Sequence, residues 1–286
     1  YNTFRYAIDI NQKNHSDYTA FMLAAGENKD EKVMKYLCDT FSPLIKINLQ
    51  SFEEDTALML AVQYNKNEKV LQHLCDTFKS TVNVSLRNHT GYTLLYIAVE
   101  STTNIKIIEC LFNAFKYRFN INKAFMRAVE CNTNEKIIEF LYNACKDKSV
   151  IDRQKALVMA ARYNVNEKVT QYLCDTFKDT IDINKQNGYG NTALMLAIKY
   201  NTNIEVIKYL CDTFKNTIDI NKQDNYGQTA LMLATNKKLI QYVCDTFKDK
   251  IDINKQDSGG YTVLMLQVKK NSNIKAIQCL CDTFKD

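Results

Sequence analysis

The chain has 286 residues, with 37 lysines and arginines against 32 aspartates and glutamates, 7 glycines, 1 proline and no tryptophan. This composition excludes a disordered or linker-rich protein and favours helices. The net charge of +5 is spread along the chain, which argues against a nucleic-acid partner, and no apolar run approaches the ~18 residues that cross a bilayer.

The ten cysteines say something about the compartment. Disulfide frameworks are typical of short secreted scaffolds, whereas this chain is long and has no apolar leader-like start in the part given. We therefore expect a reducing compartment, the cytoplasm, or the host cytoplasm if the source is a virus or an intracellular bacterium. The chain lacks an initial methionine, so we also expect that it is a piece of a longer protein.

Two short strings recur along the chain. The first helix-like string is TALMLA or a variant of it, and its copies begin at Thr19, Thr56, Thr93, Lys123, Lys155, Thr192, Thr229 and Thr262. The second is LCDTF or VCDTF, at Leu37, Leu74, Leu173, Leu210, Val243 and Leu280. The usual period is 37 residues, as from Thr19 to Thr56. A catalytic motif has no reason to recur in this way, whereas a repeated structural unit does.

Each copy predicts two helices and a finger. In the copy that begins at Thr192, the threonine is a suitable N-cap and strong helix formers follow it. The polar stretch KYNTN, from Lys199, breaks this first helix, and apolar residues at helical spacing from Val206 to Phe214 predict a second. The segment from Ile218 to Thr229 alternates before a glycine turn, which predicts a short β-hairpin finger.

Neither helix can bury its apolar stripe alone, so the copies are expected to stack into an all-α solenoid of helix-turn-helix units. The repeated cysteines should form a ladder of buried free thiols, because equivalent positions on helices ~8–10 Å apart are too distant for disulfides. These residues are Cys38, Cys75, Cys174, Cys211, Cys244 and Cys281.

These residues resemble ankyrin repeats. DNYGQTALMLA, from Asp224 to Ala234, is similar to the family pattern D-x-x-G-x-T-P-L-H-x-A, IEVIKYL from Ile204 resembles its second helix, and IDIN resembles the approach to the next finger. The resemblance covers residues 1–286 and implies a single domain of about eight repeats. Their first helices are expected near residues 19, 56, 93, 123, 155, 192, 229 and 262.

The departures from the family pattern also carry predictions. Because the period exceeds the usual 33 or so and no glycine follows LCDTF, the second helix should be about one turn longer and should end without a glycine cap. Short connectors before Lys123 and Lys155 predict shortened fingers in repeats four and five. Since these lysines replace the capping threonine, both helix starts should be weaker by ~1 kcal/mol. The copy at Thr229 is four residues shorter than the others.

No constellation of reactive groups can be assembled. The histidines His15, His73 and His89 lie far apart in the sequence, and there is no C-x-x-C, H-E-x-x-H or phosphate-binding loop. We expect no catalytic residue, no metal and no cofactor. The aspartate after each repeated cysteine is interpreted as a helix-surface ion pair with the lysine three places later, up to Lys285.

The resemblance implies a concave surface made of the finger tips and the exposed side of the first helices. The residues expected to bind a partner are Phe52, Arg87, Tyr92, Tyr189, Asn191, Tyr226, Gln228, Tyr261, Tyr163 and Tyr200. Tip glutamines such as Gln186 and Gln223 belong to the same surface, and Lys270 to its first-helix side. Tyr163 and Tyr200, like Tyr64, could equally be packing residues at the end of the first helix, and both alternatives stay open.

The expected function is non-catalytic binding of a protein partner whose identity the sequence does not reveal, with no nucleic acid and no membrane insertion. One alternative is an adaptor region of a longer protein whose catalytic or recruiting domain lies outside this segment. Another is a structural assembly component that self-associates through uncapped ends.

Overall fold

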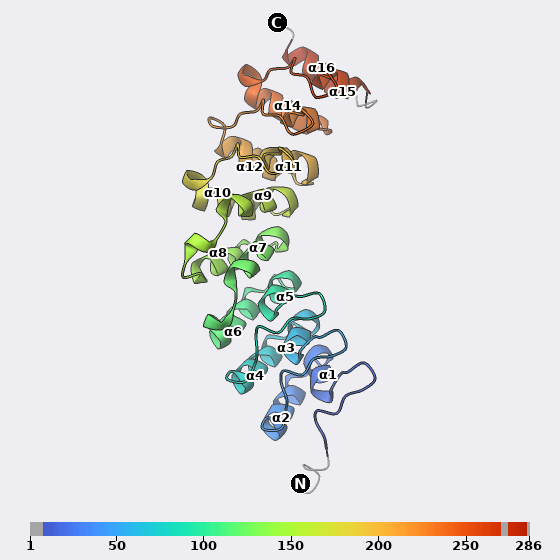
Figure 1. Ribbon diagram of the computed structural model, residues 1–286, viewed down its shortest axis with the longest axis vertical. Coiled ribbons are helices and arrows are strands. Elements are labelled where there is room, and N and C mark those ends of the chain that lie inside the picture. The colour runs from blue at the N-terminus through green and yellow to red at the C-terminus, as the bar shows by residue number, and fades with distance from the viewer. Residues whose placement is uncertain (1–7, 270–273, 285–286) are drawn as a thin grey trace. The chain divides into compact units, whose positions relative to one another are not determined.

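The computed structural model describes residues 8–269 and 274–284, apart from the side chain of Tyr117 (Figure 1). Within these ranges the regular structure consists of sixteen α-helices with short 3₁₀ and π turns and contains no strand, so the predicted all-α class is confirmed. Lys270 and Lys285, which the sequence assigned to a first helix and to an ion pair, lie outside the described residues.

The chain divides into two compact units by its internal contacts. Unit 1 comprises residues 1–128 and 136–148, and unit 2 comprises residues 129–135 and 149–286. Each unit is a stack of helix pairs, and each is described by itself below. The single domain that we expect over residues 1–286 stays a prediction.

Unit 1 holds the first three helix pairs and most of the fourth. In the first three pairs the first helix is shorter than the second, and in the second pair it continues as a π turn, η1. The helices are α1 (Ala20–Glu27) and α2 (Glu31–Phe41), α3 (Ala57–Leu60) with η1 (Ala61–Asn65) and α4 (Glu68–Phe78), α5 (Leu94–Ser101) and α6 (Ile105–Phe115), and α7 (Ile121–Cys131) and α8 (Glu135–Ala144).

Unit 2 holds the last four pairs. The seventh pair contains the four-residue deletion, and its first helix is correspondingly only four residues long. The helices are α9 (Arg153–Tyr163) and α10 (Glu167–Phe177), α11 (Ala193–Tyr200) and α12 (Ile204–Thr213), α13 (Ala230–Leu233) and α14 (Lys237–Phe247), and α15 (Val263–Lys269) and α16 (Ile274–Thr283).

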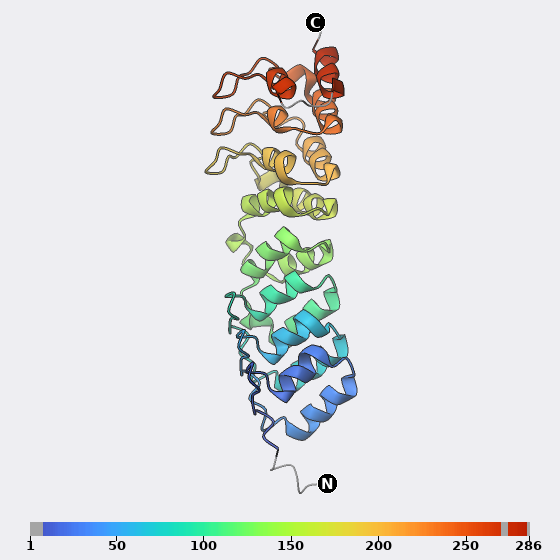
Figure 2. The same ribbon diagram turned by 90° about the vertical axis from the view of Figure 1, so that its right-hand side faces the viewer.

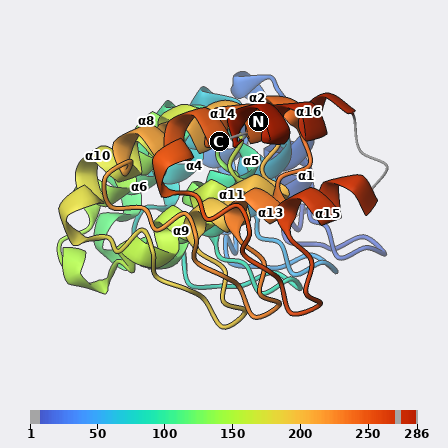
Figure 3. The same ribbon diagram turned by 90° about the horizontal axis from the view of Figure 1, so that it is seen from above.

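Within each unit, first helices pack against first helices of the neighbouring repeat, and second helices pack against second helices. In unit 1 α1 contacts α3 and α2 contacts α4, while in unit 2 α9 contacts α11 and α10 contacts α12. Leucines, isoleucines and phenylalanines of the second helices fill the space between the layers, and Leu74, Leu173 and Leu210 are fully buried. Figure 3 shows that the first helices of unit 2 lie between the finger loops and the second helices. The first helices are therefore the ones placed beside the fingers.

In six copies the first helix begins one residue after the repeated threonine. Thr19, Thr192 and Thr229 are N-caps, and their hydroxyls accept hydrogen bonds from the amide three residues later. In repeats four and five the first helix begins at Ile121 and Arg153, two residues before the lysine that replaces the threonine.

Other polar residues cap these two helices. The Asp152 carboxylate accepts a hydrogen bond from the Lys155 amide at 2.9 Å, and Asn120 Oδ1 accepts one from the Lys123 amide at 3.2 Å. Lys123 and Lys155 thus lie in the first turn and do not occupy the capping position. The expected loss of ~1 kcal/mol at each start was wrong, because it placed the missing cap at the wrong residue.

The second helices end without glycine, as predicted. Four of them, α2, α4, α10 and α14, end at the phenylalanine of LCDTF or VCDTF, and a 3₁₀ turn follows Phe177 and Phe247 directly. The αR residue at the C-cap, such as Lys178, continues the turn so that its own amide reaches the Cys174 carbonyl. This leaves residues 79–93 for a full finger after α4, but only residues 116–120 after α6 and 145–152 after α8.

The polar stretch that ends each first helix contains a buried asparagine. In unit 2 the Asn164 side chain is 2% exposed, and its Nδ2 donates to the carbonyls of Val129 at 3.0 Å and Asn132 at 2.9 Å. Asn201 repeats the arrangement one repeat later, donating to Ala161 and Asn164. Each amide thus satisfies carbonyls at the helix end of the preceding repeat, which have no partner within their own helix. The stack is joined by polar contacts as well as apolar ones.

The cysteine ladder is confirmed except at its last member. Cys38, Cys75, Cys174, Cys211 and Cys244 are buried, and all ten cysteines are free. Cys281 is exposed, because its side of α16 lines a groove with Leu264 and Phe284 that no described element covers. A buried thiol in this position acts as a small apolar side chain.

The expected aspartate–lysine ion pairs were wrong for the described helices of unit 2. Asp175 accepts a hydrogen bond from the Tyr209 hydroxyl at 2.8 Å, and Asp212 accepts one from Tyr242 at 2.7 Å, in each case from the second helix of the next repeat. Asp245 accepts instead from Gln241, four residues earlier in α14. The carboxylates of Asp175 and Asp212 therefore connect successive second helices on the outer side of the stack, whereas that of Asp245 does not.

Candidate partner-binding surface

The fingers are turns stabilised by a single side chain. In the finger of repeat seven the Asp224 carboxylate accepts hydrogen bonds from the amides of Tyr226 and Gln228, both at 2.9 Å. Asn14, Asn88, Asn187 and Asp257 occupy the same place and accept from the corresponding amides. The residue two before the threonine has positive φ in every full finger, and in four of the six it is glycine. An Asp or Asn followed three residues later by glycine is the sequence signal for this turn.

The hairpin strands that we predicted for the fingers are not confirmed. The described residues show only isolated bridges between Lys13 and Thr19 and between Arg87 and Thr93. Because the turn amides bond to the Asx side chain, few remain to form a ladder of paired strands. The fingers are accordingly ordered loops that carry little regular β-structure.

Neighbouring fingers are hydrogen-bonded to one another within each unit. In unit 2 the Asn225 amide donates to the Tyr189 carbonyl at 3.1 Å and the Ser258 amide donates to the Tyr226 carbonyl at 2.9 Å. The side chain of Gln186 adds a bond to the Gln223 carbonyl at 2.8 Å. These glutamines, expected to face a partner, therefore hold the fingers together. Figure 2 shows the three loops of unit 2 on the same side of the helices.

Large aromatic side chains project from the finger tips. Phe52 is 73% exposed in unit 1, and Tyr189 and Tyr226 are 72% and 66% exposed in unit 2. The backbone that carries them is fixed by the hydrogen bonds described above. These three predicted residues lie where a partner could reach them.

The other predicted residues of unit 1 lie at the base of the fingers. Arg87 is exposed, and its guanidinium donates to the Gly91 carbonyl at 2.8 Å. Tyr92 is half-buried and stacks on Tyr96 with a centroid distance of 4.3 Å. The Arg127 guanidinium lies 5.6 Å from the Tyr96 ring centroid and forms an ion pair with Glu100.

The three remaining finger residues of unit 2 differ in accessibility. Tyr261 is 37% exposed, and the Lys269 ammonium lies over its ring at 4.3 Å from the centroid. Gln228 is half-buried. Asn191 is only 7% exposed, so its side chain offers a partner almost no surface.

The tyrosines at the ends of the first helices are exposed, and in unit 2 two of them contact cations. Tyr64 is 57% exposed, Tyr163 47% and Tyr200 45%. In unit 2 the Arg162 guanidinium lies 4.7 Å from the Tyr163 ring centroid and 4.4 Å from that of Tyr200. In unit 2 these rings pack on a cation and still expose about half of their surface, so contact of Tyr163 and Tyr200 with a partner stays a prediction.

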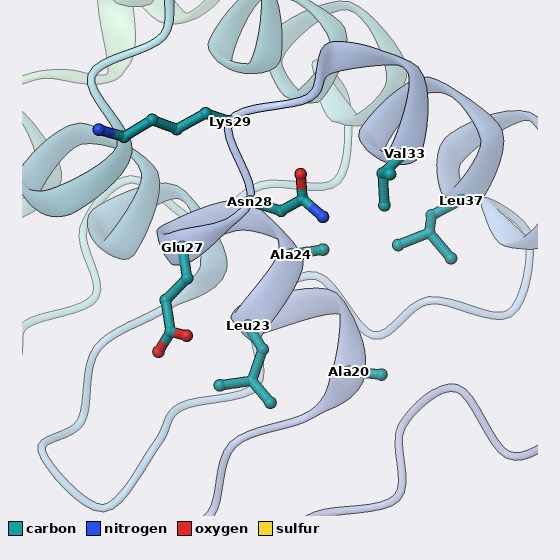
Figure 4. A pocket seen from close by; sticks show the side chains of 8 residues that line it. All are labelled: Ala20, Leu23, Ala24, Glu27, Asn28, Lys29, Val33 and Leu37. Carbon is teal, nitrogen blue, oxygen red and sulfur yellow. The ribbon is translucent and has the colours of Figure 1, made fainter.

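A shallow groove lies on the first helix pair of unit 1. Its volume is about 710 Å³, and Figure 4 shows Ala20 and Ala24 of α1 on the side toward Val33 and Leu37 of α2, with Leu23 lower on α1. Leu23 is 38% exposed and Val33 is 36% exposed. The groove is mainly apolar, with Glu27 and Lys29 at its edge, and it contains no nucleophile or metal ligand set.

The described residues contain little that suggests catalysis. His89 Nδ1 lies 2.9 Å from a Glu53 carboxylate oxygen at a finger tip, where both side chains are about half exposed. Burial raises the pKa of the neighbouring Asp55, while the amide of Asn88 at 3.2 Å acts in the opposite direction. Over residues 8–269 and 274–284 we find no cluster of three or more metal-binding side chains and no helix that could span a membrane.

Sequence reasoning missed three sets of polar residues. The turn-forming Asp and Asn side chains follow a readable local pattern. The buried asparagines after the first helices do not, because their partners lie about one repeat away, and the same is true of Asn48 and Asn184, which join successive finger bases. The basic character of the first helices in unit 2 appears only once the helix bounds are known.

A known protein family matches most of the chain. The family described as "Ankyrin repeats (3 copies)" matches the chain over residues 1–79, 21–124 and 125–224, and no curated protein matches it significantly. Together these matches cover most of the chain, and they coincide with the stacked helix pairs and fingers seen in both units. The chain therefore belongs to the ankyrin repeat family.

Proposed function

We propose that the chain is a non-catalytic module that binds a protein partner through its finger tips and the exposed side of its first helices. Ankyrin repeats are generally protein–protein interaction modules. The observation that carries the finer proposal is the exposure of Phe52, Tyr189 and Tyr226 on fingers whose backbones are hydrogen-bonded to each other. An exposed aromatic ring on a rigid backbone loses little conformational freedom when it becomes an interface anchor.

The test is affinity capture of the partner with the immobilised chain. It compares two variants, each of which lacks one exposed tyrosine. Tyr226→Ala should lose most of the specifically captured partner, because it removes a tip anchor. Tyr36→Ala should retain the partner, because Tyr36 is also 66% exposed but lies on α2, a second helix. Equal capture by the wild type and the Tyr226→Ala variant would remove the fingers from the proposed surface.

Self-association is a second candidate, favoured by the apolar groove between α1 and α2. Within unit 1 the corresponding faces of the second and third repeats are covered by the preceding helix pair, as when α1 contacts α3 and α2 contacts α4. If a second copy covers this one, the sedimentation coefficient of the chain should rise with concentration, and Leu23→Lys should abolish the rise. A concentration-independent monomer would exclude this candidate.

A further inference from the structure

We propose that the inner side of unit 2 binds an acidic segment of the partner, with Asp or Glu carboxylates directed at the basic–aromatic cluster. We define this cluster as Arg162, Tyr163, Lys199 and Tyr200, at the ends of α9 and α11. The inference rests on the proposed function and deepens it, because it assigns a chemistry to the partner.

The geometry of the cluster holds two cations in place. The Arg162 guanidinium lies over both tyrosine rings, at 4.7 Å from the centroid of Tyr163 and 4.4 Å from that of Tyr200. The Lys199 ammonium lies 5.3 Å from the centroid of the same Tyr200 ring. Contact with aromatic faces restricts these long side chains without neutralising their charge. The cluster is thus partly organised for an anion before one arrives.

No carboxylate of the described residues neutralises these cations. The Arg162 Nε–H is buried and has no hydrogen-bond acceptor in this part of the chain, and neither cation belongs to an ion pair there. Glu167, the next acidic residue after Arg162 in the sequence, already accepts a hydrogen bond from Asn203 at 3.1 Å. Lys199 is exposed, so an incoming carboxylate would meet a cation that forms no ion pair with the described residues.

The first helices of unit 2 carry more basic than acidic residues. Of these helices, α9, α11 and α15 contain arginine or lysine and no aspartate or glutamate, and α13 has no charged residue. Glu130, near the end of α7, also belongs to unit 2. In unit 1, α1 and α5 have the opposite character, with Glu27 and Glu100 and no basic residue. Since the chain as a whole is almost balanced, this difference belongs to the surface and not to the overall composition. It favours an acidic partner on unit 2 in particular.

A protein segment fits this surface better than a nucleic acid. Nucleic-acid binding normally depends on many phosphate contacts spread along a groove, whereas the cluster offers two cations. The exposed parts of Tyr163 and Tyr200 and the 48% exposed Val165 add apolar surface beside the charges. Carboxylates next to apolar side chains, as in an acidic peptide, match both features, and the Arg162 fork matches a carboxylate.

The test uses a fluorescein-labelled peptide of alternating glutamate and alanine and follows its anisotropy as the chain is added. We expect binding with a Kd below about 1 mM at low salt, weakening as salt rises. The double variant Arg162→Gln, Lys199→Gln should lose at least tenfold in affinity. Arg162→Lys keeps the charge but not the planar fork, so its affinity for the peptide should lie between those of the wild type and the double variant.

The control variant removes the same charge elsewhere in unit 2. Lys168 and Lys248 are exposed and lie on, or directly after, second helices. The double variant Lys168→Gln, Lys248→Gln should bind the peptide within twofold of the wild type. Far-UV circular dichroism and the unfolding midpoint establish that each variant is folded, so that a loss of binding is not a loss of structure.

Three outcomes would overturn the inference. The first is that the glutamate peptide does not bind, and the second is that both double variants lose the same affinity for it. The third is that single-stranded DNA binds more tightly than the peptide and that its binding depends on Arg162 and Lys199. Failure here is distinguishable from failure of the proposed function. If Tyr226→Ala still loses the captured partner while the peptide does not bind, only the acidic specificity is wrong.

Discussion

At the scale of single residues, the buried asparagines show how a polar side chain can serve a stacked fold. Asn164 and Asn201 each donate two hydrogen bonds to carbonyls of the preceding repeat. A buried polar group is stabilising only when it is paired, and here the pairing crosses a repeat boundary. The interaction therefore depends on correct stacking.

Replacing Asn164 with alanine should be strongly destabilising. The carbonyls of Val129 and Asn132 would lose their donors, so we expect the free energy of unfolding to fall by about 2–4 kcal/mol in urea titrations. The control is Asn254→Ala, since Asn254 is exposed and its side chain makes no described bond, and its effect should stay within about 0.5 kcal/mol. Similar losses of unfolding free energy in both variants would contradict a stabilising role for the buried asparagine side chains.

The buried thiols predict a pH dependence of stability. Burial raises the pKa of Cys174 and of Cys211 to about 12 from an ordinary value of 9.0. The unfolded chain then loses these protons first, so the contribution of these two thiols to the free energy of unfolding should be constant below about pH 9. It should fall between pH 9 and pH 12 by up to about 1.4 kcal/mol per pH unit for each thiol.

A pair of valine variants isolates this effect from other groups that titrate in alkali. Cys211→Val should reduce the slope of unfolding free energy against pH between 9 and 11, measured in urea under reducing conditions. Cys281→Val should leave the slope unchanged, because Cys281 is exposed. An unchanged slope in Cys211→Val would show that this thiol does not remain protonated in the folded chain.

At the scale of elements, the start of α9 separates two explanations of helix capping. Asp152 is the observed N-cap, and its carboxylate also lies near the positive end of the helix dipole. Asp152→Ala should lower the free energy of unfolding by about 1 kcal/mol. Lys155→Thr should not raise it, since residue 155 already lies within the first turn. A stabilised Lys155→Thr variant beside a neutral Asp152→Ala variant would reverse the assignment.

The fingers allow a matched glycine comparison. Gly227 and Gly260 have φ of 73° and 77°, so alanine at either should cost about 1–2 kcal/mol for the left-handed backbone alone. A Cβ at Gly227 would lie 2.6 Å from the Ser258 nitrogen, whereas nothing lies within 4 Å of one at Gly260. Gly227→Ala should therefore be more destabilising and should speed hydrogen exchange of the Ser258 amide. Equal effects would mean that finger contacts contribute nothing measurable.

How far the elements could be predicted depended on where their determinants lie in the chain. Helices that begin at a threonine cap followed by apolar residues were located correctly, because both signals are local. Those at Ile121 and Arg153 were not, since their caps, Asn120 and Asp152, stand outside the repeated string. The Asn164 bonds and the Tyr209–Asp175 contact join residues about one repeat apart, and no local pattern encodes such partners.

The candidate surface was predicted less completely than the fold. The tips Phe52, Tyr189 and Tyr226 are exposed, as the turn chemistry implies, but Asn191 is buried although it belongs to the same finger as Tyr189. Whether a finger residue faces outward or supports the turn depends on the hydrogen bonds of the finger, which the sequence does not specify. The contacts of Arg162 with Tyr163 and Tyr200 likewise require the helix ends to be known.

At the scale of the whole molecule, the central claim is that partners contact the fingers and the first helices of the ankyrin repeats, with the second helices facing away. The direct measurement is photo-crosslinking with benzoylphenylalanine in place of Tyr226 or, separately, Tyr36, using the captured partner. The account predicts a covalent adduct from position 226 and none from position 36. An adduct from position 36 alone, or equal adducts from both, would contradict it.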